Sequence, residues 1–320
     1  QYTFGDSYYV GMASKHGIQA PFLIRQQLIN SSGTLSCQTA GSTAELGVNG
    51  VKPLGKAAAG DNPATSGATV GIDSMIYIPA GGGPTPTDTF YIANNGGMNY
   101  STGAPTSSAS FNSAGLNGGV GNPILDNTYL GTTNGPTLVL PYGNPSDTNV
   151  GGLGKIRPGQ KGVPFLTVYK NVMYMARNLG QSQTSVLETV NNGAELWKCS
   201  ANCTTQTNWK KALTISNFSG GANNLAISVL TVNGGALYVG LDNTIDGVRI
   251  FRTTVSEIDS DNSGNDGHND FVQQTTAGLT NPINFKYFFS STSMTKGSYS
   301  YIYVTVMDGK NAINVARQVD

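Results

Sequence analysis

Charged residues are scarce in this 320-residue chain, at 11% of the total, whereas a typical soluble domain has about 25%. The 18 basic and 18 acidic side chains cancel, so the chain has no excess of positive charge for a phosphate backbone, which excludes nucleic acid as an expected partner. No stretch of about 18 apolar residues occurs, which excludes a membrane-spanning helix. In place of charged residues the chain has 42 glycines and many Asn, Ser and Thr residues. This composition predicts a secreted or cell-surface protein, matured by removal of an N-terminal signal.

Histidine is nearly absent as well, with only His16 and His268 in the chain. The sequence contains no zinc-protease motif, no nucleophile elbow and no dinucleotide-binding fingerprint. A glycosidase with a pair of carboxylates stays open as an alternative, because its two acids need not be close in sequence. Eight acidic residues are candidates for such a pair: Asp6, Asp73, Asp88, Asp126, Glu188, Glu195, Asp242 and Glu257. None of them is distinguished by its context, so the sequence favours a non-catalytic protein.

The clearest local pattern covers residues 232–252, which read as a turn, a strand, a polar turn and a second strand. Asn233-Gly234-Gly235 tolerates positive φ and predicts the first turn. Residues 237–239 are a short apolar run of β-formers. Asp242-Asn243 predicts the second turn, and residues 248–252 alternate as in a strand with one buried face. The segment is therefore a predicted β-hairpin, which needs neighbouring strands because two strands alone are marginal in water.

Weaker copies of this hairpin recur along the chain, each with a tyrosine in its first strand. The tyrosines are Tyr9, Tyr77, Tyr129, Tyr174, Tyr238 and Tyr303. Both Tyr238 and Tyr303 are followed 14 residues later by an arginine, Arg252 and Arg317 respectively. Short hairpins repeated at roughly 40 to 65 residues are typical of propeller blades with loops of variable length. We therefore predict an all-β fold, a β-propeller of about six blades, with five or seven blades or a β-sandwich as the alternatives.

The predicted domain organisation is a single propeller domain over residues 1–320, since all-β folds of this size often form one domain. Long Gly-, Ser- and Asn-rich loop excursions are expected near 30–70, 96–122 and 143–162. One strand is expected inside the first of them, near residues 44–46. Long loops on a rigid scaffold are where recognition residues gather, so contacts with a partner are expected there.

Three cysteines occur in the chain. Cys199 and Cys203 have three residues between them, and in a low-charge exported chain this spacing predicts a local disulfide that fixes a turn between Trp197 and Trp209. A metal site is the alternative, although no second cysteine pair or nearby histidine completes a zinc set. Cys37 then has no partner in this scheme, and we expect either a buried free thiol or a disulfide to another chain.

The sharpest chemical signal is residues 259–270, D-S-D-N-S-G-N-D-G-H-N-D. Ca²⁺ takes six to eight oxygen ligands, and alternate side chains of a tight loop can converge on one ion. The loop resembles the EF-hand loop and the related Asp-rich calcium loops of extracellular propellers, with Gly264 at the sharp bend. This resemblance implies a structural Ca²⁺ held by five residues: Asp259, Asp261, Ser263, Asn265 and Asp270. The bland alternative is a solvated turn rich in Asp and Asn.

The pattern N-G-x-x-L-Y-V-G followed by G-x-x-I-F-R, at residues 233–252, resembles the blade sequences of secreted bacterial β-propeller proteins. Such a fold does not fix a function by itself. The leading expectation is a non-catalytic structural or adhesion component of an extracellular assembly, stabilised by Ca²⁺. Its expected partners are other copies of itself or a protein or glycan of the cell surface. The alternative is a carbohydrate-active enzyme, a hydrolase or lyase, or a lectin that uses the central face of the propeller.

Overall fold

The computed structural model describes residues 2–4, 7–11, 22–31, 34–37, 51–56, 74–94, 97–103, 162–178, 194–243, 245–256, 258, 270–275, 279, 285–307 and 313–319. The chain divides into two compact units, Gln1–Thr148 and Asn149–Asp320. The described part is almost entirely β-structure. Its helices are 3-10 turns of three residues each, η5 (Gln206–Asn208), η6 (Ile215–Asn217) and η7 (Gly221–Asn223). No helix in the described segments is long and apolar enough to cross a membrane.

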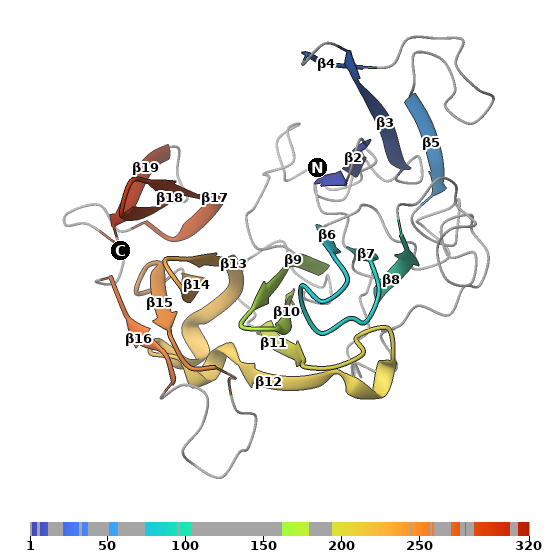
Figure 1. The fold of residues 1–320 in the computed structure, drawn as a ribbon. Coiled ribbons are helices and arrows are strands. Elements are labelled where there is room, and N and C mark those ends of the chain that lie inside the picture. The colour runs from blue at the N-terminus through green and yellow to red at the C-terminus, as the bar shows by residue number, and fades with distance from the viewer. Residues whose placement is uncertain are drawn as a thin grey trace, which may run out of the picture. The chain divides into compact units, whose positions relative to one another are not determined.

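The first unit contains two antiparallel sheets (Figure 1). The five-stranded sheet is formed by β1 (Tyr2–Phe4), β2 (Ser7–Gly11), β3 (Phe22–Ser31), β4 (Thr34–Cys37) and β5 (Val51–Lys56). The three-stranded sheet is formed by β6 (Ser74–Ile78), β7 (Thr89–Asn94) and β8 (Gly97–Thr102). Phe90, Tyr91 and Ile92 of the central strand β7 are buried, so both faces of this sheet are covered.

The second unit contains three antiparallel sheets, and in each the strands pair in chain order (Figure 1). The first comprises β9 (Gly162–Tyr169), β10 (Val172–Asn178), β11 (Ala194–Cys199) and β12 (Lys210–Thr214). The second comprises β13 (Asn224–Asn233), β14 (Ala236–Asn243), β15 (Arg249–Thr253) and β16 (Val272–Gln273). The third comprises β17 (Tyr287–Lys296), β18 (Tyr299–Met307) and β19 (Ile313–Val319).

The three sheets of the second unit are arranged as consecutive propeller blades. β13 lies against both β9 and β17, so the first strands of the three sheets are neighbours, as innermost strands are in a propeller. One apolar core, with Leu196 and Leu237 among its members, lies between the first and second sheets. Another, with Tyr238 and Val304, lies between the second and third sheets. The predicted all-β propeller fold is therefore confirmed, whereas its blade number and single-domain organisation stay predictions.

The tyrosine repeat corresponds to a fixed place in the blade. Tyr174, Tyr238 and Tyr303 lie on the second strand of their sheets, and each stands directly opposite a basic residue of the third strand. The pairs are Tyr174 with Lys198, Tyr238 with Arg252 and Tyr303 with Arg317, and Tyr9 faces Arg25 in the same way in the first unit. The regular spacing of tyrosine and arginine thus reflects cross-strand pairing.

Tyr77 does not fit this alignment, because it lies on β6, an end strand of its sheet, and the central strand contributes Tyr91. The copy predicted at Tyr129 lies outside the described residues.

Several local predictions need correction. β4, β5 and β8 lie inside stretches that were predicted to be loops, while residues 44–46 are outside the described part. Asp242 and Asn243 are the buried last residues of β14, although their polarity predicted a solvated turn. The Asn243 carboxamide still organises that turn from inside, because its Oδ1 accepts from the backbone amides of Ile245 and Asp246.

Candidate functional site

The predicted calcium loop is mostly outside the described residues. Asp259, Asp261, Ser263 and Asn265 are not described, and Asp270, just before β16, is partly buried. The described residues contain no cluster of three or more His, Cys, Asp or Glu side chains that could hold a metal ion. The Ca²⁺ site therefore stays a prediction. The same is true of the Cys37 thiol, since the structure places that residue at the end of β4 without describing its side chain.

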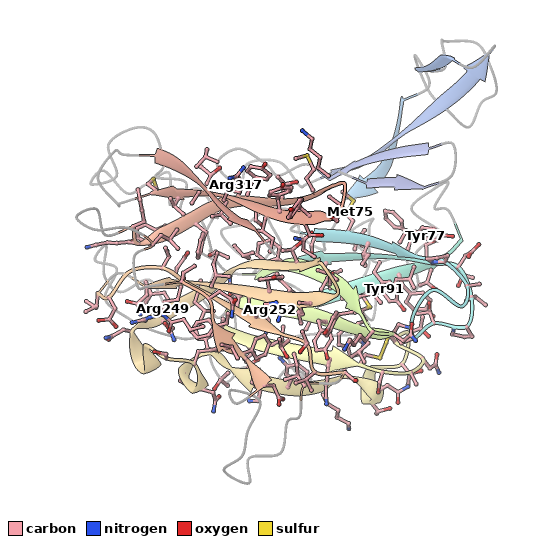
Figure 2. The ribbon with its side chains drawn as sticks, turned by 60° about the vertical axis from the view of Figure 1, so that its left-hand side comes forward. Met75, Tyr77, Tyr91, Arg249, Arg252 and Arg317 are labelled. Carbon is pink, nitrogen blue, oxygen red and sulfur yellow. A yellow bond between two sulfur atoms is a disulfide. The ribbon has the colours of Figure 1, made fainter. Side chains whose placement is uncertain are left out.

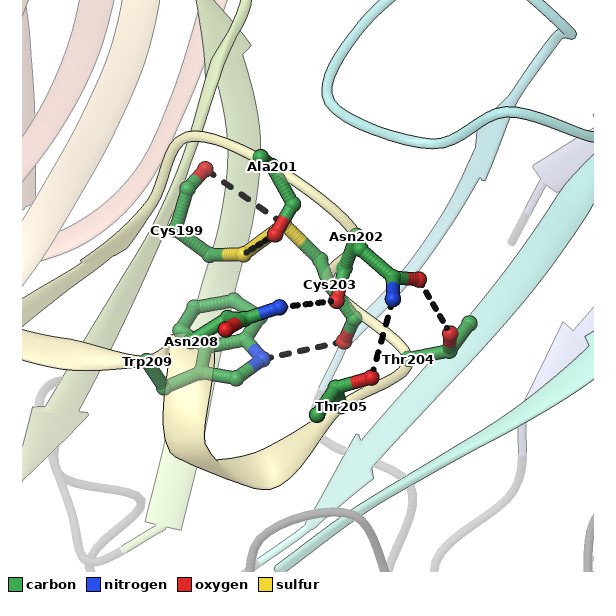
Figure 3. Close-up of a disulfide and its surroundings, with 8 residues drawn as sticks. All are labelled: Cys199, Ala201, Asn202, Cys203, Thr204, Thr205, Asn208 and Trp209. Atoms are coloured by element: carbon green, nitrogen blue, oxygen red, sulfur yellow. Dashed lines mark hydrogen bonds between the residues drawn. A yellow bond between two sulfur atoms is a disulfide. The ribbon is translucent and has the colours of Figure 1, made fainter.

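The predicted disulfide between Cys199 and Cys203 is confirmed, with the two Cα atoms 5.7 Å apart (Figure 3). Both cysteines are buried, and the indole Nε1 of the buried Trp209 donates a 3.0 Å hydrogen bond to the carbonyl oxygen of Cys203. Trp197 is buried as well, so both tryptophans belong to the core. The bridge holds the turn that seats Trp209, which is a structural role.

The carboxylates that the sequence offered for catalysis are engaged separately wherever the structure describes them. Asp88 is exposed and accepts hydrogen bonds from the hydroxyl of Tyr77 at 3.1 Å and from the amide of Ala80 at 2.8 Å. The Asp242 carboxylate accepts from Phe288 and Ser228. The others, Asp6, Asp73, Asp126, Glu188 and Glu257, have no described side chain.

Glu195 lies in a buried ion-pair cluster on the first sheet of the second unit. Its Oε2 accepts from Arg177 at 3.0 Å and from the indole Nε1 of Trp197 at 2.8 Å, and its Oε1 lies 3.4 Å from Lys211. Burial lowers the pKa of Arg177 from its usual value, and the adjacent Glu195 opposes that shift. Since each oxygen of Glu195 is already committed to a cation or an indole, the geometry describes a structural cluster rather than a general acid or base.

One polar side chain fastens each of the first two sheets of the second unit to the sheet that follows it. Asn178, at the end of β10, accepts from the backbone N–H of Ile227 and donates to its carbonyl oxygen, both at 2.9 Å. Asp242, at the end of β14, accepts from the backbone N–H of Phe288 at 2.8 Å and from the hydroxyl of Ser228 at 2.7 Å.

The two fastening residues are equivalent. Each lies four residues after the tyrosine of its strand, and each contacts the first strand of the next sheet beside a β-bulge that interrupts the ladder. Burial raises the pKa of the Asp242 carboxyl well above its usual range, and the hydrogen bonds from Phe288 and Ser228 offset part of that rise. Sequence reasoning missed this role, although the shared spacing from Tyr174 and Tyr238 is visible in the chain.

One face of the third sheet points away from the core that this sheet shares with the second sheet. On β18, Ile302, Val304 and Val306 enter the core shared with the second sheet, so Tyr299, Tyr301 and Tyr303 lie on the opposite face. We call this opposite face the tyrosine face. Its members with a described side chain, by cross-strand register, are Ser290, Thr292, Met294, Lys296, Tyr299, Tyr301, Tyr303, Thr305, Met307, Val315 and Arg317. It extends over all three strands of the sheet.

The tyrosine face exposes large side chains. Tyr299 is 58% exposed, Met294 46% and Val315 65%, whereas the tyrosines of the first two sheets, Tyr174 and Tyr238, are 0% and 1% exposed. The rings of Tyr299 and Tyr301 are 6.4 Å apart, and those of Tyr301 and Tyr303 6.2 Å. Exposed apolar and aromatic side chains gathered on one face make it a candidate binding surface.

Arginine is used differently on the covered and the open sheets (Figure 2). In the second sheet, the Nε of Arg252 donates to the hydroxyl of Tyr238 at 3.2 Å. In the third sheet, the guanidinium of Arg317 lies over the ring of Tyr301, 5.4 Å from its centroid, and remains exposed. A guanidinium stacked on an aromatic ring keeps its N–H donors available at the rim for a ligand.

The side chains of the open face are also larger than those that a following sheet covers. Three positions near the tyrosine can be compared across the first, second and third sheets. Two residues before the tyrosine they are Val172, Ala236 and Tyr301, and two residues after it they are Ala176, Gly240 and Thr305. Four residues after the tyrosine they are Asn178, Asp242 and Met307. The first two sheets thus have small residues and a polar fastener, which permit close approach of the next sheet. At these positions the third sheet has larger side chains and no polar fastener.

No protein-family model matches this sequence, and neither does any curated protein. Among solved structures, a glycoside hydrolase family 43 arabinoxylan arabinofuranohydrolase from Bacillus subtilis is similar, with 12% identity over 95% of this chain and a TM-score of 0.41. An α-L-arabinofuranosidase from Lactobacillus brevis has 11% identity over 95% of this chain and a TM-score of 0.40. The chain spans 57% of the length of the first and 80% of the second. Similarities this weak carry nothing about activity, and the fold follows from the sheets themselves.

Proposed function

We propose that this protein is a carbohydrate-recognising β-propeller that contacts its glycan through the tyrosine face. The observation that carries the proposal is the row of Tyr299, Tyr301 and Tyr303. Tyr299 is 58% exposed and the other two are partly exposed, whereas the equivalent tyrosines of the two preceding sheets are buried. The sequence analysis gave a lectin as one alternative, and we now prefer it to the structural or adhesion role that the sequence favoured.

The chemistry of the face suits a sugar. The C–H side of a pyranose ring stacks on an aromatic ring, and its hydroxyls need donors and acceptors at the rim. The face supplies both, because the tyrosine rings are flanked by the hydroxyls of Thr292 and Thr305. The 6.2 to 6.4 Å between consecutive rings favours an extended glycan that meets more than one tyrosine over a single sugar ring.

Binding, without hydrolysis, is the activity proposed for the described surface. A glycosidase needs two free carboxyl groups on opposite sides of the scissile bond. None of the three strands of the open sheet contains Asp or Glu, and the described Asp88, Glu195 and Asp242 bond to other groups of the protein. The predicted Ca²⁺ in residues 259–270 would have a structural role, and its loop joins β15 to β16.

The test is affinity electrophoresis of the purified protein in gels that contain soluble polysaccharides. The matched pair is Tyr301→Ala, which removes the central ring of the row, and Val272→Ala, which truncates a 63% exposed side chain on β16. We expect Tyr301→Ala to weaken retention about tenfold, equivalent to about 1.4 kcal/mol, and Val272→Ala to leave it unchanged.

Two results would overturn the proposal. One is a wild-type protein that no polysaccharide retards. The other is a Tyr301→Ala variant that binds glycan normally but melts many degrees lower, which would make the tyrosine face an internal packing surface.

A further inference from the structure

The charges on the tyrosine face are all of one sign. β17, β18 and β19 contain no Asp or Glu, and the face has two cations, Lys296 and Arg317. Both are exposed. The chain as a whole is neutral, so this one-sided pattern belongs to the sheet and is not a consequence of composition. The loop between β18 and β19 has one charge of each sign, Asp308 and Lys310, and lies outside the described residues.

The two cations mark opposite parts of the tyrosine row. Lys296 stands directly across from Tyr299, at the hairpin end of the sheet. Arg317 stands across from Tyr303 and lies over the ring of Tyr301. A sugar chain stacked along the row would therefore meet a positive charge at each part of its length.

Each element of this surface suits an acidic sugar. A planar guanidinium presents paired N–H donors that match the two oxygens of a carboxylate, and hydrogen bonds between charged partners are about twice as strong as neutral ones. The face has no carboxylate to compete for Arg317, because its other members are hydroxyl, aromatic, apolar or cationic side chains.

We propose that the tyrosine face binds an acidic polysaccharide of the uronate class, with its sugar rings on Tyr299, Tyr301 and Tyr303 and its carboxylates at Arg317 and Lys296. This inference rests on the proposed glycan-binding function and narrows it to one class of ligand. Arg317 is the residue that distinguishes an acidic sugar from a neutral one, since it alone joins the cation to the aromatic row.

The test compares polygalacturonate with its fully methyl-esterified form, which keeps the sugar backbone and removes the charge. Polyglutamate serves as a polyanion without sugar rings. Binding of each is measured by titration calorimetry at low and at moderate salt, for the wild type and for Arg317→Gln, Arg317→Lys and Tyr301→Ala. Lys210→Gln, which removes an exposed cation on β12, is the matched control.

For the wild type, we expect polygalacturonate to bind about tenfold more tightly than the ester, with the difference shrinking as salt rises. Arg317→Gln should remove the difference and keep weak binding of both polymers. Arg317→Lys should keep part of the preference, because the charge remains and the paired donors are lost. Lys210→Gln should match the wild type.

The outcomes separate this inference from the function on which it rests. Equal binding of polygalacturonate and its ester overturns the acidic-sugar inference and leaves glycan recognition standing. If neither polymer binds, both the acidic-sugar inference and the proposed glycan-binding function are overturned. Polyglutamate binding as strong as that of polygalacturonate, and indifferent to Tyr301→Ala, overturns the inference in favour of simple charge attraction. A melting curve for each variant shows that the change lies in binding and not in folding.

Discussion

The second and third sheets of the second unit share the same tyrosine–arginine pair but differ in how deeply its tyrosine is buried. In both, a tyrosine on the second strand stands opposite an arginine on the third, Tyr238 with Arg252 and Tyr303 with Arg317. In the second sheet this face is buried under the third, with Tyr238 1% exposed. On the same face of the third sheet, Tyr299 is 58% exposed and Tyr303 is only partly buried.

The difference lies in the residues beside the tyrosine. Ala236 and Gly240 leave room for the next sheet, and Asp242 fastens to its first strand. Tyr301, Thr305 and Met307 stand at those positions in the third sheet, where they fill the room and offer no fastener. A blade face that the next sheet covers therefore has small residues beside the tyrosine and a buried Asn or Asp at the end of the strand. The face of the third sheet instead has larger side chains, hydroxyl groups and cations.

The fastener at Asn178 should have the largest effect on stability. Asn178→Ala leaves the N–H and the carbonyl oxygen of Ile227, which is fully buried, without their partner, and we expect a loss of about 3 kcal/mol in the free energy of unfolding. The corresponding change in the open sheet, Met307→Ala, should cost less than about 1.5 kcal/mol, since Met307 is half-buried. Urea unfolding followed by tryptophan fluorescence measures both, and equal losses would break the comparison.

Gly240 should have the next largest effect. A Cβ at this position would lie 2.7 Å from the side chain of Val229, on the neighbouring strand of the same sheet, and 3.1 Å from the ring of Phe288 in the next sheet. Gly240→Val therefore overfills both contacts, and we expect a loss of about 2 kcal/mol, whereas Thr305→Val, at the equivalent place of the third sheet, should stay within about 0.5 kcal/mol. A Gly240→Val variant as stable as the wild type would show that neither contact is tight.

The buried Asp242 should make the stability of the folded protein depend on pH. Its folded pKa is raised by burial, so its ionisation destabilises the folded protein progressively as pH rises from the unfolded pKa, near 4, through the folded pKa. Two charged residues lie on the segments that adjoin the end of β14. Arg249 of β15 is bound to Asp246 and to the carbonyl oxygen of Ser219, and Lys286, just before β17, accepts a backbone hydrogen bond from Asn243 through its carbonyl oxygen.

Asp242→Asn keeps an oxygen for the amide of Phe288 and matches the residue at Asn178. We expect it to raise the melting temperature at pH 7 by about 2 °C or more, with the gain disappearing toward pH 4. Melting curves between pH 4 and 8 measure it. A gain that is the same at every pH would assign the effect to packing and not to ionisation.

The repeat was visible in the sequence because it has a physical period. Alternating apolar residues, the Asn233-Gly234-Gly235 turn and the fourteen-residue step from Tyr238 to Arg252 each reflect local geometry, and the strands lie where these signals predict them. The Cys199–Cys203 bridge followed from its spacing in the same way.

The missed features depend on contacts that composition alone does not show. β8 is rich in Gly, Asn, Ser and Thr, and its strand conformation comes from its ladder with β7. Asp242 looked like a turn residue because its acceptor role requires Phe288, 46 residues away. The tyrosine face could not be predicted either, since only the packing of Ile302, Val304 and Val306 on the second sheet shows which side of β18 stays open.

The most direct test of the central claim is residue-level nitration of the folded protein by tetranitromethane, read by peptide mass spectrometry. Nitration reports solvent access to each tyrosine ring and needs no knowledge of the ligand. We predict that Tyr299 reacts first, followed by Tyr301 and Tyr303, while Tyr174 and Tyr238 remain unmodified until the protein unfolds. Protection of Tyr299 and Tyr301 to the same degree as Tyr238, in the absence of any ligand, would contradict the account.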